Sequence, residues 1–455
     1  MKILGLKRDI VKQLIREGRV TIAVYGLGHV GLPLAALLAD KGAHVIGVDV
    51  KNEIVNAVNS GENPIEEEPG LGELIVKNVR EGRLEATTNG VEAARRADVH
   101  IITVPVLVDQ YGNIDLKALI DAAENICRGL EKGDTVVTET TLPPGTTESL
   151  QTIFDKSGLK LGDYGLAHAP ERIMTGTAIR DMTVQYPKII GASDEKTLEA
   201  VAGIYESINT RGVIAVSSIR AAEAVKVFEG VYRYVNIALA NELALWAEEN
   251  GLDVLEIIKT ANTQPYCHIH MPGAGVGGHC IPVYPWFIVR TFKTRKAKLL
   301  ETAREINDYM PHHMVKLTIK ALNMAGRPVM NSNILILGLS YRGNVKGVYK
   351  SPAPVIAREL REEWGARVFV YDPYFTPEEV EKMGFTWKRD FKDIDAIVIV
   401  TDHKEFKNLN LEKIAKEVKT RIIVDGRHVI NPHEALKHGF IFLGVGRTYP
   451  ERLEY

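Results

Sequence analysis

The chain has 455 residues, 45% of them hydrophobic and 25% charged, which is typical of a globular protein with about three compact units. The formal net charge of −2 excludes the basic surface that nucleic-acid or membrane-surface binding needs, so we expect neither partner. No apolar run reaches the length of a membrane span, and residues 1–20 predict an amphipathic helix without a signal-peptide core. We therefore expect a cytoplasmic protein.

The first half of the chain alternates strand and helix patterns. A β-branched run at residues 20–25, a helix to about residue 41 and a second strand at residues 44–50 predict a β-α-β unit. Further buried-strand patterns lie at residues 99–105, 134–140, 164–170, 188–193 and 212–218. This order predicts a mostly parallel sheet, and we assign residues 1–218 to one α/β domain.

A long helical pattern follows at residues 219–250 and contains a single breaker, Gly230. We expect it to be a spine between domains, and we expect a second helix-rich stretch at residues 296–325 to be interrupted at Pro311. Residues 219–330 are therefore assigned to a central helical region. Strand and helix patterns resume at Asn333, so residues 331–455 form a second α/β domain. The predicted fold class is α/β, with two doubly wound Rossmann-like domains joined by a long central helix.

The strongest local motif is GLGHVG at residues 26–31, between the first strand and the following helix. Gly26 makes the tight turn, Gly28 admits a pyrophosphate to the helix N-terminus, and Gly31 lets helix and strand pack closely. We assign His29 and Val30, which lie between the glycines, to the same cofactor site. The alternative is a glycine turn required only for packing.

Asp49 ends the second strand, where a carboxylate can accept hydrogen bonds from a ribose diol. The same charge disfavours a 2′-phosphate, so NAD is favoured over NADP even though Lys51 lies two residues later. The turn and the carboxylate together predict dinucleotide binding.

A second glycine turn, GLSYRG, follows the first strand of the second domain at residues 338–343. Asn344 follows Gly343 where a Walker loop needs lysine, and the middle glycine of the dinucleotide motif is missing as well. Tyr341 and Arg342, near the expected helix start, leave two interpretations open. They bind a different nucleotide, or they are solvated side chains on a turn.

Cys280 follows four glycines in the stretch GAGVGGHCIPVYPWF at residues 273–287. We expect the glycines to keep side chains away from the sulfur, and His279 to favour a nucleophilic thiolate. The alternative is an inert core thiol. Since Cys127 and Cys267 form no CxxC pair with it or with each other, we predict reduced thiols and no metal site.

A dinucleotide site and a thiolate together indicate one kind of chemistry. Removing a hydride from an alcohol needs only a base, whereas removing one from an aldehyde first needs a tetrahedral adduct. A thiohemiacetal supplies this adduct, and the resulting thioester is hydrolysed to an acid. The residues therefore predict oxidation of an alcohol to a carboxylate by two hydride transfers.

Five segments resemble the UDP-glucose/GDP-mannose dehydrogenase family, in matching order along nearly the whole chain. They are GLGHVG (26–31), TETTLPPGTTE (138–148), APER (169–172), AAEAVKVFEGVYRYVNIALANEL (221–243) and GVGGHCIPV (275–283). The resemblance implies an N-terminal NAD domain, a central helix that forms the core of a homodimer or higher homo-oligomer, and a C-terminal UDP-sugar domain.

The sequence GGHCI is similar to the branch of the family that acts on UDP-N-acetylhexosamines. It implies NAD-dependent oxidation of UDP-N-acetylmannosamine at C6 to UDP-N-acetylmannosaminuronate, for surface polysaccharide biosynthesis. UDP-N-acetylglucosamine and UDP-glucose are the alternative substrates. Two other possibilities are a dinucleotide-binding protein without chemistry and a one-step hydroxyacid dehydrogenase that yields one NADH per substrate.

The resemblance also assigns catalytic residues. Cys280 matches the nucleophile, Lys226 the residue that stabilises the oxyanion, and Glu171 and Thr141 the residues that hold or activate the hydrolytic water. Thr141 is assigned to the cofactor site as well. The residues expected to contact substrate are Arg172, Ile173, Lys226, Arg233, Asn236, His268, His270, Gly273, Tyr341 and Arg342.

The chain departs from the family pattern in three places. Gly230 stands where most members have asparagine, and Tyr284 where most have aspartate. In the second domain, YRGNVKGVYKSP at residues 341–352 replaces FKxxxxDxRESP. We expect Lys226 to carry more of the oxyanion stabilisation here than in other members.

Overall fold

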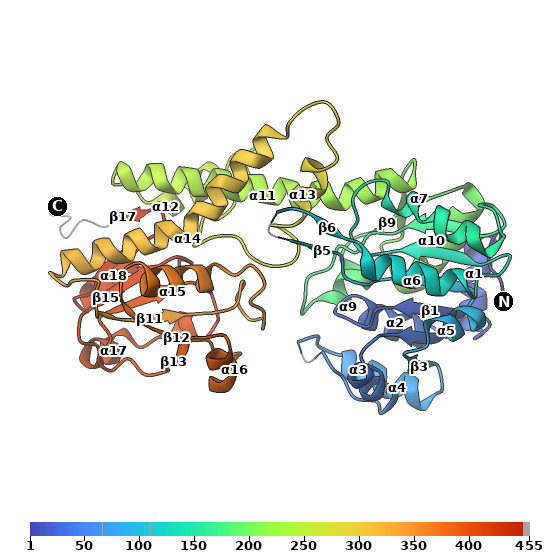
Figure 1. The fold of residues 1–455 in the computed structure, drawn as a ribbon, viewed down its shortest axis with the longest axis horizontal. Helices are drawn as coiled ribbons and strands as arrows, with labels where there is room; N and C mark the ends of the chain where they lie inside the picture. Colours follow the sequence, from blue (N-terminus) through green and yellow to red (C-terminus); the bar gives the residue numbers. More distant parts are fainter. Residues whose placement is uncertain (66, 110, 449–455) are drawn as a thin grey trace. The chain divides into compact units, whose positions relative to one another are not determined.

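A computed structural model describes residues 1–65, 67–109 and 111–448. The chain forms two compact units, which we call unit 1 (Met1–Glu229 and Trp286–Thr291) and unit 2 (Gly230–Pro285 and Phe292 onward). Each contains one large sheet with helices on both faces (Figure 1). Within the described residues, no helix has both the length and the apolarity that crossing a bilayer demands.

Unit 1 contains an eight-stranded sheet in the order β3-β2-β1-β4-β7-β8-β9-β10. Neighbouring strands are parallel except for β8 and β9, which run antiparallel with His168 opposite Gly191. The predicted strands and their mostly parallel arrangement are therefore confirmed. The strands are β1 (Thr21–Tyr25), β2 (His44–Val48), β3 (Leu84–Thr87), β4 (Val99–Ile102), β7 (Thr135–Thr138), β8 (Gly165–His168), β9 (Lys188–Ala192) and β10 (Val213–Ala215).

Alternation along β1 explains why helices cover both faces of this sheet. Ile22 and Val24 point into one core, and Ala23 and Tyr25 into another, because successive side chains of a strand face opposite ways. The first core is covered by α1 (Arg8–Arg16), α2 (Gly31–Asp40), α4 (Leu71–Arg80) and α10 (Glu195–Ile208), and the second by α5 (Gly90–Arg96), α6 (Lys117–Cys127) and α8 (Gln151–Phe154). Unit 1 also contains α3 (Asn52–Asn59), α7 (Thr146–Ser149), α9 (Ala178–Arg180) and the hairpin β5 (Leu107–Val108) and β6 (Ile114–Asp115).

The N-terminal helix is shorter than predicted. It begins at Arg8 and ends at Arg16, because Gly5 (φ +83°) and Gly18 (φ +70°) adopt left-handed conformations that a helix cannot contain. Its apolar face, which includes Val11 and Ile15, packs into the first core of unit 1.

Unit 2 repeats the same strand order, β13-β12-β11-β14-β15-β16-β17. The strands are β11 (Asn333–Leu337), β12 (Arg367–Tyr371), β13 (Thr386–Trp387), β14 (Ala396–Ile399), β15 (Ile422–Asp425), β16 (Ile441–Gly444) and β17 (Arg447–Thr448). The helices are α12 (Val254–Ala261), α14 (Lys298–Met324), α15 (Pro352–Glu362), α16 (Pro377–Lys382), α17 (Leu411–Glu417) and α18 (Pro432–Lys437). Ile334 and Ile336 of β11 face one core and Leu335 and Leu337 the other.

The long central helix is confirmed as α11 (Ile219–Glu249). The predicted interruption at Pro311 is wrong, because α14 is continuous through it. Proline costs an interior helix about 3 kcal/mol, but here its neighbours Met310 and Met314 are fully buried in the core of unit 2. That burial offsets the lost hydrogen bond.

Candidate active site

The glycine turn of unit 1 has the geometry that a dinucleotide needs. Gly26 has φ +97°, and an added Cβ would lie 3.1 Å from the backbone of Thr103. A Cβ on Gly31 would stand 1.8 Å from the carbonyl oxygen of Gly26, so helix α2 can start here only with glycine. Beside Gly28, in contrast, a Cβ would meet no atom within 4 Å, so this space is available to a ligand.

Asp49 completes the turn at the end of β2. Its Oδ2 accepts the N–H of Leu27 at 2.9 Å and its Oδ1 accepts the N–H of Lys51 at 3.0 Å, while the side chain stays partly exposed. His29 Nε2 lies 3.9 Å from Glu67 Oε2, and Val30 packs against the core. These residues fit NAD, with the helix start for its pyrophosphate and the carboxylate for a ribose.

A buried ion pair lies in the same unit. Lys226 Nζ is 3.0 Å from Glu171 Oε1, and the two residues are only 8% and 7% exposed. Glu171 follows β8, and its Oε2 accepts the N–H of Ile173 at 2.9 Å. Thr141, also buried, follows β7. Three of the predicted catalytic residues therefore lie in unit 1, two of them just beyond the carboxyl ends of neighbouring strands, where α/β sheets bind ligands.

Arg172 is held within unit 1. Its guanidinium contacts Glu229 Oε1 at 2.6 and 2.8 Å and lies 4.8 Å from the centre of the Tyr186 ring. Ile173, its neighbour, packs against the first core. If Arg172 contacts the substrate as predicted, it does so with a guanidinium that is already paired with Glu229.

A second ion pair, between a fully buried carboxylate and a lysine whose side chain is 12% exposed, was missed by sequence reasoning. Lys188, the first residue of β9, pairs with the fully buried Glu139, and Tyr205 donates to the other oxygen of that carboxylate at 2.6 Å. Burial lowers the pKa of Lys188, and burial together with the Glu139 charge raises the pKa of Tyr205 well above its ordinary value. The only local signal was a charge flanking the apolar run KIIGA.

Cys280 is exposed in unit 2, and its carbonyl accepts the N–H groups of Val283 and Tyr284 at the start of α13 (Tyr284–Val289). Two of the glycines before it also make room for other groups of unit 2. A Cβ on Gly277 would lie 2.6 Å from the carbonyl oxygen of Lys350 and 2.7 Å from Cβ of Tyr341, and a Cβ on Gly278 would lie 2.8 Å from the Tyr341 ring.

His279, the residue before Cys280, also packs against another part of unit 2. The His279 ring stacks on Tyr349 with centroids 4.1 Å apart and an interplanar angle of 5°. The segment before the cysteine is therefore packed against the loop that follows β11.

Two of the departures from the family pattern are in contact with each other. A Cβ on Gly230 would lie 2.4 Å from Cδ2 of Tyr284, so the tyrosine ring occupies the space that a side chain at residue 230 would need. Any larger residue at 230 would collide with this ring. The loss of a side chain at residue 230 therefore makes room for the larger side chain at residue 284.

The segment before the glycines is held by two asparagines. Asn236 donates to the carbonyl of His268 at 3.0 Å and accepts the N–H of His270 at 2.7 Å, and Asn241 accepts the N–H of Gly273 at 2.9 Å. Burial, with a contribution from the charge of the exposed Arg233, lowers the pKa of His270. Asn236 therefore positions residues 268–270 through their backbone.

The second glycine turn does not open a helix. Tyr341 and Arg342 were expected near a helix start, but α15 begins only at Pro352, and Tyr341 N–H bonds back to the carbonyl of Gly347 at 2.8 Å. Their expected position is therefore wrong, because Asn344 (φ +61°) turns the chain away from a helical path.

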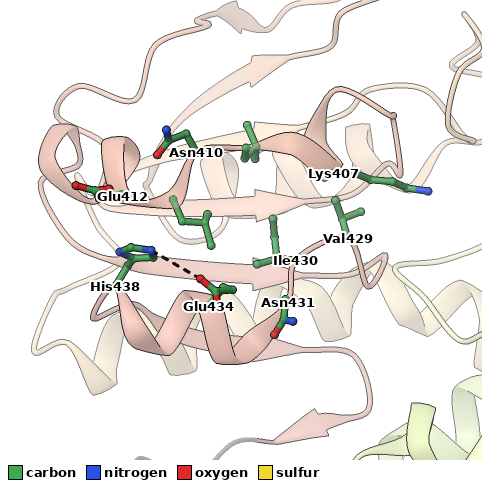
Figure 2. Close-up of a pocket in the computed structure, with 10 residues that line it drawn as sticks. Lys407, Asn410, Glu412, Val429, Ile430, Asn431, Glu434 and His438 are labelled. Atoms are coloured by element: carbon green, nitrogen blue, oxygen red, sulfur yellow. Dashed lines mark ion pairs between the residues drawn. The ribbon is translucent and has the colours of Figure 1, made fainter.

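A cavity of about 330 Å³ lies in unit 2, between α17 and α18. Figure 2 shows the side chains that line it. Asn410 and Asn431, which cap these two helices, line it together with Glu412, Glu434 and His438. Its two carboxylates do not suit an anionic diphosphate, and none of the predicted site residues lines it.

Comparison with known proteins identifies all three parts of the chain. Residues 20–209 match the NAD binding domain of the UDP-glucose/GDP-mannose dehydrogenase family, residues 220–309 its central domain, and residues 335–432 its UDP binding domain. The UDP-N-acetyl-D-mannosamine dehydrogenases of Pyrococcus horikoshii and Methanococcus vannielii are 38% and 36% identical to the chain. Each alignment covers 94% of this chain, and 99% and 96% of the relative. A solved structure of a UDP-D-ManNAc dehydrogenase from P. horikoshii superposes with a TM-score of 0.86 at 36% identity, covering 94% of this chain and 99% of that one.

Proposed function

The chain belongs to the UDP-glucose/GDP-mannose dehydrogenase family, and from this premise we propose that it oxidises UDP-N-acetylmannosamine at C6 to UDP-N-acetylmannosaminuronate. It is an NAD-dependent UDP-sugar dehydrogenase. The names of its relatives support the choice of sugar. The observation that supports the chemistry best is the buried Lys226–Glu171 pair. Burying a charged pair costs free energy, so a pair retained at the carboxyl ends of the strands indicates a functional role.

The proposed mechanism gives each residue one task. NAD, when bound, supplies the acceptor for both oxidations. The Cys280 thiolate adds to the C6 aldehyde carbon, a C–S bond forms, and the carbonyl oxygen becomes an oxyanion that the Lys226 ammonium stabilises. After the second oxidation, water held by Thr141 attacks the thioester carbon and transfers a proton to Glu171. The C–S bond then breaks and the thiolate is released.

We assign the remaining polar groups to substrate binding. Tyr341 and Arg342 would contact the UDP portion, and the segment from His268 to Gly273, with Arg233 and Asn236, would contact the sugar or the diphosphate. The stacking of His279 on Tyr349 supports an arrangement in which this segment and the loop after β11 act together. The cytoplasmic location stays a prediction.

We also propose a homodimer formed through α11. Tyr232, Leu239 and Trp246 are exposed by 53%, 46% and 54%, and their spacing of seven residues places them on one face of the helix. An apolar stripe of this kind pairs with a second copy more readily than it stays in water. Sedimentation of Leu239→Glu should give monomers where the parent chain gives dimers, and an unchanged dimer would reject this interface.

The first test is the yield of NADH per mole of limiting UDP-N-acetylmannosamine, with UDP-N-acetylglucosamine and UDP-glucose in parallel. We expect two NADH from the first sugar, and loss of this yield in Cys280→Ser. Cys127→Ser is the matched control, because that thiol is half-buried and donates to the carbonyl of Ile153 at 3.1 Å. One NADH per sugar would favour the one-step dehydrogenase, and no NADH from any sugar would favour binding without chemistry.

A further inference from the structure

The sheet of unit 1 brings a lysine to its ligand-binding edge by an unusual route. Strands β7 and β8 end there, while β9 runs antiparallel to β8 and therefore begins there. His168 pairs with Gly191, so Lys188, three residues before Gly191, lies at the end of the sheet that Glu171, three residues after His168, also follows. A strand start thus contributes a side chain among residues that follow strand ends.

The contacts of Lys188 connect it to the backbone of Glu171. Its ammonium pairs with Glu139 and lies 4.5 Å from the centre of the Tyr205 ring. The carbonyl of Glu139 accepts the N–H of Glu171 at 3.1 Å. Glu139 therefore contacts both residues: its side chain pairs with Lys188, and its main-chain carbonyl accepts the N–H of Glu171.

The electrostatics indicate that the two ion pairs are close to each other. Besides burial and Glu139, the charges of Glu171 and Lys226 act on the pKa of Lys188, the first raising it and the second lowering it. His168 also faces this group. Burial and the charge of Lys188 lower the pKa of that imidazole to about 3, so it is neutral, and its Nε2 has no hydrogen-bond partner among the described residues.

We propose that Lys188 is a positioning residue for the dehydrogenase reaction: it holds Glu171 in place through Glu139 and provides a second, largely buried positive charge that acts on the Lys226–Glu171 pair. The inference rests on the proposed role of Glu171. A carboxylate that must accept a proton from one water molecule needs a fixed position, and the low dielectric of this site makes a nearby charge effective.

The test compares kcat and KM for Lys188→Met and Lys188→Arg. We expect kcat of Lys188→Met to fall about 100-fold with both KM values within about 3-fold, because a displaced catalytic group slows the reaction more than it weakens binding. Lys188→Arg, which keeps the charge, should recover most of kcat. The matched control is Lys2→Met, which breaks the pair of Lys2 with the buried Asp134 just before β7, at the opposite end of that strand. It should leave kcat unchanged.

A neutral pair separates positioning from folding. Lys188→Met leaves Glu139 buried without its cation and can unfold the chain, whereas Lys188→Met/Glu139→Gln removes both charges and keeps an acceptor for Tyr205. We expect this double variant to be folded and still slow. Recovery of kcat in the double variant, or normal kcat in a folded Lys188→Met, would overturn the proposal. Glu171→Gln, measured in parallel, tests the function itself, because full activity there would reject the role of Glu171 whatever Lys188 does.

Discussion

The two sheets of this protein share a strand order, and the first loop of each contains a glycine turn, yet the two turns are built for opposite purposes. Gly26 and Gly338 have nearly the same φ, +97° and +98°, and each is followed by leucine. A Cβ on either glycine would lie close to a threonine that follows the neighbouring strand. This threonine is Thr103, after β4, in unit 1 and Thr401, after β14, in unit 2.

The carboxylate at the end of the second strand shows the difference. Asp49 is partly exposed and accepts one backbone N–H on each oxygen. Asp372 is fully buried, and its Oδ2 accepts the N–H groups of Leu339 and Ser340 at 2.8 and 2.9 Å and contacts His403 Nε2 at 3.0 Å. The Asp49 carboxylate remains accessible to a ribose, whereas the Asp372 carboxylate is buried by its hydrogen bonds to the glycine turn and to His403.

His403 completes the closure. Its Nδ1 accepts the N–H of Asn344 at 3.0 Å, so Nε2 carries the proton and donates to Asp372. The chain after Gly343 is thereby directed away from a helix, and no helix N-terminus is presented to a phosphate. A shared fold position therefore does not imply a shared ligand, because buried partners decide whether the polar groups of the turn are available.

The largest effect should come from the most crowded glycine. Gly31→Ala places a Cβ 1.8 Å from the Gly26 carbonyl, so the start of α2 must move, and we expect NAD affinity to fall at least about 1,000-fold, or about 4 kcal/mol. Titration calorimetry checks this. Gly343→Ala is the control, since its Cβ would be 2.4 Å from the carbonyl of Asp402. It should disturb unit 2 without changing NAD binding, and equal losses of affinity would remove the distinction between the turns.

Exchanging each aspartate for asparagine should separate stability from binding. Asp372→Asn replaces a buried carboxylate that accepts several hydrogen bonds with a neutral amide. We expect this change to lower the free energy of unfolding by about 3 kcal/mol. Asp49→Asn should cost less than about 1 kcal/mol of stability but weaken NAD about tenfold. Denaturant unfolding and NAD titration of both variants test this, and the reverse pattern would contradict it.

His168 in unit 1 and Asp372 in unit 2 should contribute to the acid response in different pH ranges. Folded His168 has a pKa of about 3 and is neutral, so unfolding takes up a proton below pH about 6.5 and stability falls by up to about 1.4 kcal/mol per pH unit. In unit 2, burial acts to raise the pKa of Asp372, but the hydrogen bond from His403 and the backbone N–H groups of Tyr374 and Ser340 hold it below its ordinary value. That contribution is therefore present above pH about 4 and is lost as pH falls through the folded pKa.

The variants His168→Asn and Asp372→Asn distinguish these ranges when unfolding is measured from pH 7 to pH 3. The first should flatten the pH dependence below pH about 6.5, and the second should change it only below pH about 4. A His168→Asn curve parallel to that of the parent chain would mean that this imidazole is not buried in its neutral form.

The smallest effect should come from restoring the missing glycine. Ser340→Gly completes a GxGxxG pattern in unit 2, but Asp372 and His403 still close the turn. We expect one NAD per chain as before, and a change in stability below about 1 kcal/mol. A second NAD equivalent in calorimetry would show that the serine alone had prevented binding.

Local patterns in the sequence predict much of the candidate site. Gly26, Gly31 and Asp49 are recognisable because their tasks depend on neighbours along the chain, and the apolar residues flanking Lys226 indicate its burial. Lys188 cannot be found in this way, since it lies at the same end of the sheet as Glu139 only because β9 runs antiparallel to β8. The contact between Gly230 and Tyr284 is hidden for a similar reason, as residues far apart in sequence show no shared periodicity.

By itself, the sequence determined the alternation of strands and helices, the long central helix and the dinucleotide turn. These features follow from residue spacing and from the conformations open to glycine and proline. Only the tertiary structure decided that α14 continues through Pro311, that the second turn is closed by Asp372 and His403, and that Lys188 pairs with Glu139, whose carbonyl accepts the N–H of Glu171. The reason is that burial and pairing depend on which segments return to the same place, and that information is not contained in any local window of the chain.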